Sequence, residues 1–149
     1  MPVEISAGAV IYRKENGENV FLLLRYPAIN HRSGADYWDY VKGHVEKGEE
    51  ELETITREAE EETGLRDLEF IDGFSHSMEY FFVYQGQKVF KSVTFRLATT
   101  KSKEIVLSDE HNDFAWLPYE EAYAALSFEN AKHVLKKANE LLQKNEQKN

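Results

Sequence analysis

The chain has 149 residues, 42% of them hydrophobic and 13% aromatic, which is enough to build one packed core. Its 27 acidic and 18 basic residues give a net charge of −9, which argues against a protein held on DNA by a basic face. The absence of cysteine excludes disulfides, thiolate metal sites and a cysteine nucleophile.

No segment has the pattern of a membrane anchor or a secretory signal. The longest plainly apolar run, Val20–Leu24, is far below the roughly 20 residues that a membrane-spanning helix needs. The N-terminus lacks the basic-then-apolar layout of a signal peptide. We therefore expect a cytoplasmic protein, not bound to a membrane, that folds as a single domain over residues 1–149.

The first third of the chain is predicted to form strands. Small and β-branched residues favour a strand over Val3–Arg13, and Asn16-Gly17 is a turn signal that pairs it with Val20–Arg25. Residues 26–36 have the composition of a loop. A short aromatic strand is then expected over Tyr37–Val41.

The clearest helix signal lies in the middle of the chain. Residues 49–63 contain neither glycine nor proline, and Gly64 follows as a C-cap. Leu52, Ile55 and Ala59 fall at helical spacing and predict the buried stripe of this helix.

The remaining segments complete an α+β pattern. Two or three strands are expected over Leu68–Thr99, with a break at residues 85–87, and a short strand over Phe114–Leu117. Pro118 suits the first turn of a short helix. A last amphipathic helix is predicted over about 131–143, followed by a frayed tail at 144–149. This order favours helices packed on a mixed sheet.

Three carboxylates of the central helix point to a metal. Glu58, Glu61 and Glu62 lie at i, i+3 and i+4 and therefore share a face, and Glu62 falls at the edge of the apolar stripe. Like charges this close repel unless a cation joins them, and oxygen ligands favour Mg²⁺ or Mn²⁺. Such a charge run also fits a solvated helix face, so the residues alone leave both interpretations open.

The spacing around these carboxylates matches a known motif. Gly43, then Glu49, then the run from Arg57 to Leu65 resembles the complete Nudix box, GX5EX7REUXEEXGU, over residues 43–65. The resemblance implies a Nudix-type α/β/α sandwich with a mixed β-sheet, in which the box forms a catalytic loop–helix–loop. It also implies Mg²⁺- or Mn²⁺-dependent hydrolysis of a nucleoside diphosphate linked to another group, by metal-activated water.

The resemblance assigns roles to the residues of the box. It implies metal binding by Glu58, Glu61, Glu62 and the Gly43 carbonyl, and pairing of Arg57 with Glu49 to orient the helix. Glu61 is our preferred catalytic base. The alternatives for the base are Glu62 and Glu110, and an outer metal contact is expected for Glu46, which fits a solvated loop equally well.

The residues before the box suggest a subgroup. The segment Trp38-Asp39-Tyr40-Val41-Lys42-Gly43-His44 resembles asymmetrical diadenosine tetraphosphate (Ap4A) hydrolases, which implies cleavage of Ap4A to ATP and AMP. Tyr80, sixteen residues after Gly64, fits the same subgroup. The alternatives are another Nudix substrate, such as an RNA 5′ end, a diphosphoinositol phosphate, ADP-ribose or a damaged nucleotide, or a nucleotide-binding module without turnover.

Substrate contacts are expected from a second set of side chains. Lys42, His44 and Lys91 suit phosphate oxygens, although each could be a free surface cation. Tyr80 and Phe128 suit the two faces of a nucleotide base, although both could belong to the core. Further expectations are polyphosphate guidance by Arg25, His31 and Arg32, and core positions for Trp38 and Trp116. The partner is a small-molecule nucleotide, and monomer and dimer stay open.

Overall fold

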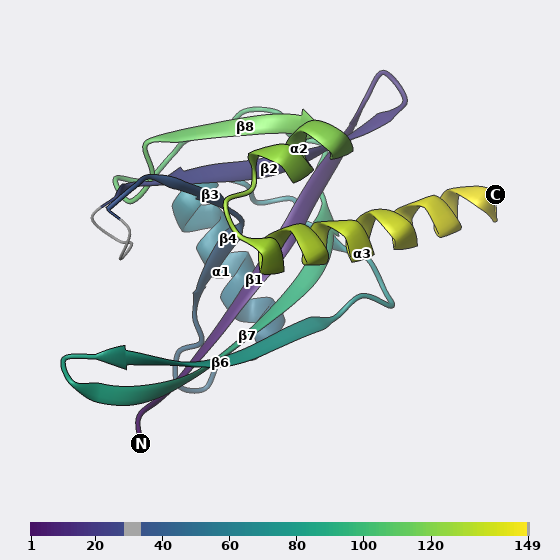
Figure 1. The fold of residues 1–149 in the computed structure, drawn as a ribbon. Helices are drawn as coiled ribbons and strands as arrows, with labels where there is room; N and C mark the ends of the chain where they lie inside the picture. The colour runs from purple at the N-terminus through teal and green to yellow at the C-terminus, as the bar shows by residue number, and fades with distance from the viewer. Residues whose placement is uncertain (29–33, 149) are drawn as a thin grey trace.

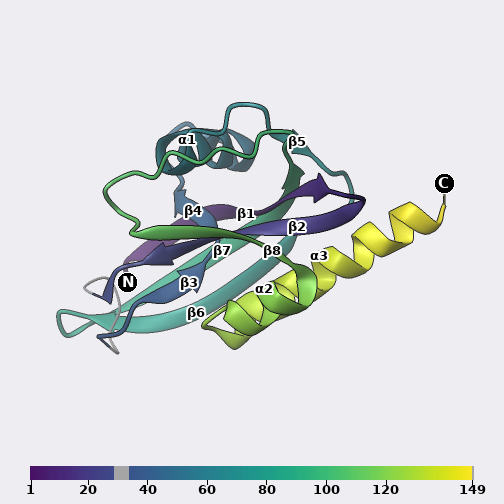
Figure 2. The ribbon, with the colours of Figure 1, turned by 90° about the horizontal axis from the view of Figure 1, so that it is seen from above.

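A mixed sheet carries one helix on one face and two on the other (Figures 1 and 2). The computed structural model describes residues 1–28 and 34–148. In this part of the chain, α1 covers one face of the sheet, and α2 and α3 cover the opposite face, as the view from above shows best. The expected α+β sandwich is confirmed.

Two long strands form the centre of the sheet. β1 (Val3–Glu15) runs parallel to β7 (Gln87–Thr99) and antiparallel to β2 (Glu18–Tyr26). The tight turn between β1 and β2 has left-handed backbone at Asn16 and Gly17, as the turn signal predicted. Antiparallel neighbours complete the sheet: β5 (Glu69–Phe70) and β6 (His76–Tyr84) on β7, and β8 (Asp113–Pro118) on β2.

The single strand expected over residues 37–41 is in fact two. β3 (Tyr37–Asp39) pairs with β2, whereas β4 (Val41–His44) pairs with β1. The chain changes partner at Tyr40, whose backbone N–H donates to the Asp39 carboxylate at 2.8 Å instead of to a neighbouring strand. A side chain that replaces a ladder hydrogen bond explains the break.

Helix α1 (Glu51–Thr63) begins two residues later than expected and ends at the predicted cap. Glu50 and Glu53 form a capping box at its start, and Gly64 has the left-handed backbone of a C-cap, with φ of 77°. Ile55 and Ala59 are buried, but Leu52 is exposed, because the helix packs on the sheet mainly through its later turns.

The C-terminal part of the chain differs most from expectation. Pro118 ends β8 and precedes α2 (Tyr119–Ala125) instead of lying within its first turn. α3 spans Glu129–Gln147, so the expected limits of 131–143 and the frayed tail from residue 144 are wrong. Glu146 accepts hydrogen bonds from Lys14 and Asn19, and these contacts hold the last turn against the β1–β2 hairpin.

Each face of the sheet has its own apolar core. On one face Ile55 and Ala59 of α1 pack against residues that include Ala9 and Leu22. On the other face α3 packs against a second set of strand residues, and its own buried residues are Ala131, Val134, Leu135, Ala138 and Leu142. Trp116 and Trp38 are partly buried against the first and the second core, respectively.

The described helices contain no candidate membrane span. Within residues 1–28 and 34–148, none combines the length and the apolarity needed to cross a bilayer.

Candidate active site

The site has two parts, and the first is a group of carboxylates on α1. The Glu62 side chain is only 3% exposed and the Glu58 side chain 14%, whereas the Glu61 side chain is 57% exposed. Glu58 and Glu62 are therefore mostly buried. Glu61, which precedes Glu62 on the helix, lies at the solvent-facing rim of this carboxylate group.

Gly43 brings the backbone of β4 against this group. A Cβ atom at position 43 would lie 2.1 Å from Cδ of Glu58 and 2.3 Å from its Oε1. No side chain fits there unless the Glu58 carboxylate moves away. The glycine therefore allows the backbone and a carboxylate to approach one another closely.

Arg57 ties the start of the box to the carboxylates. Its Nε and Nη2 donate to the two oxygens of Glu49 at 2.8 and 3.0 Å, and Nη1 donates to Glu58 at 2.7 Å. A longer contact of 3.4 Å reaches Glu61, and Nη2 also donates to the His44 carbonyl at 3.1 Å. Hydrogen bonding to Arg57 is the main reason that the pKa of Glu49 falls to about 2.

Glu62 is a buried acid beside other acids. Burial, followed by contact with Glu58 and the charge of Glu110, raises the pKa of Glu62 to about 10. Its Oε2 atom is buried and has no hydrogen-bond partner among the described residues. A bound cation would resolve both the repulsion and the unpaired oxygen, so the donor set fits a divalent metal.

The carboxylates are not yet arranged as a closed metal site. As the side chains stand, the described residues contain no group of three or more histidine, aspartate or glutamate side chains that could hold an ion. Arg57 draws Glu58 and Glu61 towards itself.

His111, to which the sequence expectations gave no role, lies against Glu62. Its Nε2 atom is 3.1 Å from Glu62 Oε1, and its side chain is fully buried. Burial lowers the pKa of His111 to about 4, so the ring is neutral. The preceding residue, Glu110, stays exposed, but its charge acts on Glu62.

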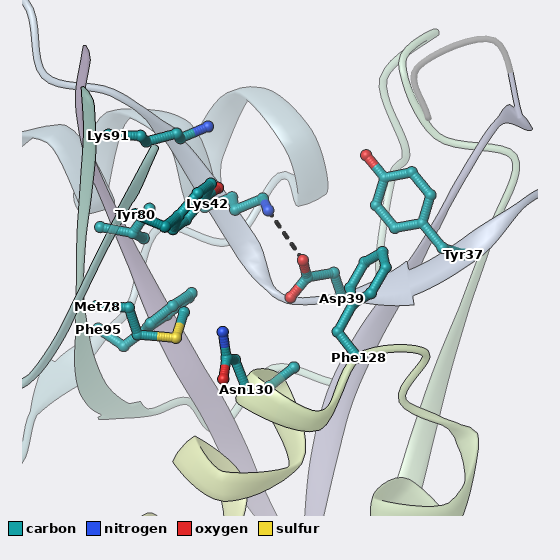
Figure 3. Close-up of a pocket in the computed structure, with 11 residues that line it drawn as sticks. Tyr37, Asp39, Lys42, Met78, Tyr80, Lys91, Phe95, Phe128 and Asn130 are labelled. Atoms are coloured by element: carbon teal, nitrogen blue, oxygen red, sulfur yellow. Dashed lines mark hydrogen bonds and ion pairs between the residues drawn. The ribbon is translucent and has the colours of Figure 1, made fainter. Parts of the chain in front are cut away.

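The second part of the site is a cavity of about 380 Å³ on the α3 side of the sheet. Figure 3 shows Tyr80 and Met78 of β6 on one wall, with Lys91 and Phe95 of β7. The opposite wall is formed by Tyr37 of β3 and by the start of α3, including Phe128 and Asn130.

Two lysines and one aspartate give this cavity its charge. Lys42 Nζ lies 2.9 Å from Oδ2 of the buried Asp39 (Figure 3). Burial opposes the charge on Lys42, but Asp39 outweighs it and raises the pKa of Lys42. Burial and the charge of Lys42 lower the pKa of Lys91. A ligand with a flat apolar ring and an anionic chain suits this mixture of aromatic and cationic groups.

A buried tyrosine connects the two parts. The Tyr26 ring stacks on Tyr37 with centroids 4.9 Å apart, and it meets the His111 ring edge-on at 4.4 Å. Lys42 Nζ lies 5.9 Å from the centre of the same ring. The contacts from Glu62 through His111 and Tyr26 to Tyr37 therefore join the carboxylate group to the cavity.

The structure brings most predicted substrate residues together. Lys42, Tyr80, Lys91 and Phe128 all line the cavity. His44 does not: its Nδ1 atom lies 3.5 Å from Ser6 Oγ. Glu46 lies 3.8 Å from Arg57.

The expected polyphosphate guides are placed only in part. Arg25 pairs with Asp36 at 3.2 Å. His31 and Arg32 lie outside the described residues.

Sequence reasoning missed Asp39, Tyr37 and Asn130, which also line the cavity. Asp39 and Tyr37 belong to the segment that carried the subgroup resemblance, so alternation along that strand could have placed them. Asn130 had no such signal.

Comparison with known proteins identifies the family. The family model for the NUDIX domain matches residues 2–138. The chain belongs to the Nudix family. As a Nudix hydrolase, it shares with its family a nucleotide substrate and a general use of divalent metals.

Several relatives with similar sequences share one name. A mouse protein named bis(5′-nucleosyl)-tetraphosphatase [asymmetrical] is 35% identical over 147 residues, covering 92% of this chain and 94% of the mouse protein. A Caenorhabditis elegans protein of the same name is 32% identical and covers 89% and 91%. The crystal structure of a C. elegans Ap4A hydrolase binary complex has a TM-score of 0.78 and 29% identity, and covers 94% and 98%.

Proposed function

We propose that this Nudix hydrolase cleaves Ap4A to ATP and AMP with Mg²⁺ as its cation. One observation carries the proposal: the contacts of His111 and Tyr26 join an aromatic and cationic cavity to the buried Glu62 of the Nudix box. The similarity to proteins named asymmetrical tetraphosphatases supports the choice of substrate.

The metal-binding residues are Glu58, Glu62 and the Gly43 carbonyl, with Glu61 joining from the rim. When bound, Mg²⁺ lowers the pKa of water and neutralises the charge that builds up on the phosphoryl oxygens. Arg57 orients α1 through Glu49 and also holds the Glu58 carboxylate.

Glu61 is the proposed base. Its side chain is more than half exposed, so a proton taken from the attacking water can leave to solvent. The buried Glu62 is less suited to this exchange, because its carboxylate is enclosed between helix and sheet.

The cavity binds one adenosine. Tyr80 and Phe128 face it from opposite walls and can stack on the two sides of an adenine ring (Figure 3). Lys42 and Lys91 donate to phosphate oxygens between the base and the carboxylates. His44 does not line this cavity. Its proposed phosphate contact would therefore lie outside the cavity, beside Gly43, with a more distant phosphate of the substrate.

A substrate panel tests this function. The protein is incubated with Mg²⁺ and, separately, Ap4A, ADP-ribose, capped RNA, a diphosphoinositol phosphate and 8-oxo-dGTP, and the products are separated by chromatography. We expect ATP and AMP in equal amounts from Ap4A, and no turnover after EDTA treatment. Two ADP molecules, or faster turnover of another substrate, would overturn the substrate assignment but keep the family mechanism.

A further inference from the structure

We propose that His111 is a positioning residue that fixes the Glu62 carboxylate for cation binding. The inference rests on the proposed function, because it assumes that Glu62 binds a metal. It concerns a residue outside the Nudix box, contributed by the loop between β7 and β8.

The contact between His111 and Glu62 is enclosed. The His111 side chain is 0% exposed and the Glu62 side chain 3%, and 3.1 Å separate Nε2 and Oε1. Burying polar groups away from water costs free energy unless they form hydrogen bonds or bind an ion. Because both side chains are enclosed, the orientation of His111 determines which Glu62 oxygen it can contact.

The loop that carries His111 is fastened to the protein at both ends. The Ser108 N–H donates to the Glu62 carbonyl at 3.3 Å, and the Asn112 N–H donates to the Arg25 carbonyl at 3.1 Å. Between these points, the Glu110 N–H donates to the Ser108 hydroxyl at 3.3 Å. The loop is thus held between the last turn of α1 and β2, with Glu110 and His111 between the two attachment points.

The imidazole ring itself is held on two sides. Its Nδ1 atom lies 3.3 Å from Ser108 Oγ, and the ring makes a T-shaped contact with Tyr26. If the Ser108 hydroxyl donates to Nδ1, then Nδ1 carries no proton, and the ring N–H is on Nε2, which is the atom beside Glu62.

The remaining atoms show what the pair lacks. Both His111 Nε2 and Glu62 Oε2 are buried without an aligned hydrogen-bond partner among the described residues. A small turn of the Glu62 carboxylate lets Nε2–H donate to Oε1 and leaves Oε2 as the free ligand. A bound cation would favour this turn, so His111 and the cation share one carboxylate.

Two substitutions separate the donor from the packing. His111→Phe keeps a ring against Tyr26 but removes both nitrogens, whereas His111→Gln can place an amide N–H near the position of Nε2. Ser108→Ala removes the partner of Nδ1 and provides a variant with a smaller risk of misfolding. His133→Phe is the matched control, because His133 lies on α3 and contacts His76 on the opposite side of the sheet.

The test measures Mn²⁺ binding to the full chain without substrate, by titration calorimetry, together with the unfolding temperature of each variant. We expect His111→Phe to weaken Mn²⁺ binding by about 10-fold or more, as is typical for residues that orient a ligand. Ser108→Ala should weaken it in the same direction. His111→Gln and His133→Phe should stay close to the wild type. In a Glu62→Gln background, His111→Phe should cause no additional loss.

The outcomes distinguish this inference from the proposed function. If the wild type binds Mn²⁺ and cleaves Ap4A but His111→Phe binds equally well, His111 does not position Glu62, and only the inference fails. Equal weakening by Phe and Gln overturns the role of the donor. If the wild type neither binds Mn²⁺ nor cleaves Ap4A in Mg²⁺, the proposed function fails, and the inference with it.

Discussion

The two parts of the site are built in different ways from the same strand. Gly43 of β4 faces α1 and lies against Glu58, whereas its neighbour Lys42 faces the cavity on the α3 side. Successive strand residues point to opposite faces, so one short strand supplies both parts. The carboxylate part comes mainly from residues 43–62, but the cavity gathers residues from β3, β4, β6, β7 and α3.

This difference assigns the catalytic step to the carboxylates and substrate binding to the cavity. The carboxylate part depends on helical spacing and on one glycine, which a local sequence segment can encode completely. The cavity depends on how four strands and a helix pack. Substitutions in the first part should therefore change catalytic rate, and substitutions in the second should change substrate affinity.

The largest effect is expected from removing a charge beside Gly43. Glu58→Gln should lower kcat for Ap4A by about 1,000-fold, because a group that binds the cation is lost from the reacting centre. Glu60→Gln is the control, since Glu60 lies on the exposed side of α1 and pairs with Arg66. Steady-state kinetics in Mg²⁺ measures both. If Glu58→Gln changed only KM, Glu58 would contribute to substrate binding and not to the catalytic step.

A comparison of two glycines tests the close approach of β4. Gly43→Ala should lower kcat by about 100-fold, because its Cβ displaces the Glu58 carboxylate. Gly8→Ala would place a Cβ 2.6 Å from the Val41 carbonyl oxygen, so it should instead lower the free energy of unfolding, by about 1–3 kcal/mol. Kinetics and urea unfolding distinguish the two. Equal loss of stability in both variants would refute the distinction.

The cavity should respond through KM. Tyr80→Ala removes a stacking partner worth about 1–3 kcal/mol, so KM for Ap4A should rise by about 5- to 150-fold with little change in kcat. Tyr80→Phe should keep most of the affinity. Tyr84→Ala is the control, because Tyr84 is exposed at the end of β6 and does not line the cavity. An unchanged KM for Tyr80→Ala would show that the adenine of Ap4A does not bind in this cavity.

The smallest effect concerns stability and pH. The pKa of Glu49 falls from 4.5 to about 2 in the folded protein, mainly through Arg57, so its contribution is present above pH 4.5 and is lost as the pH falls towards 2. Chemical unfolding should show Glu49→Gln less stable than the wild type near neutral pH, with the difference shrinking in acid. A difference that grows as the pH falls would have the wrong sign for this ion pair.

The same contrast explains what the sequence could predict. The end of α1, the β1–β2 turn and the burial of Glu62 follow from local signals: a capping glycine, a turn dipeptide and helical spacing. The split between β3 and β4 does not, because it depends on Asp39 accepting a hydrogen bond from Tyr40 while the chain changes strand partners.

Long-range contacts account for the other differences. The last turns of α3 are polar and give no burial signal, but Glu146 anchors them to residues more than a hundred positions earlier in the chain. His111 was not assigned for a similar reason. Its importance follows from a loop brought onto α1 by backbone hydrogen bonds, and no spacing within the sequence reports that contact.

The central claim is that the carboxylates and the cavity act on one substrate molecule. The most direct test is a crystal structure of the protein with Mg²⁺ and a non-hydrolysable Ap4A analogue. The account predicts one adenine between Tyr80 and Phe128, a polyphosphate beside Lys42 and Lys91, and the cation bound by Glu58 and Glu62. An adenine bound elsewhere, with the cavity empty and the cation in place, would contradict it.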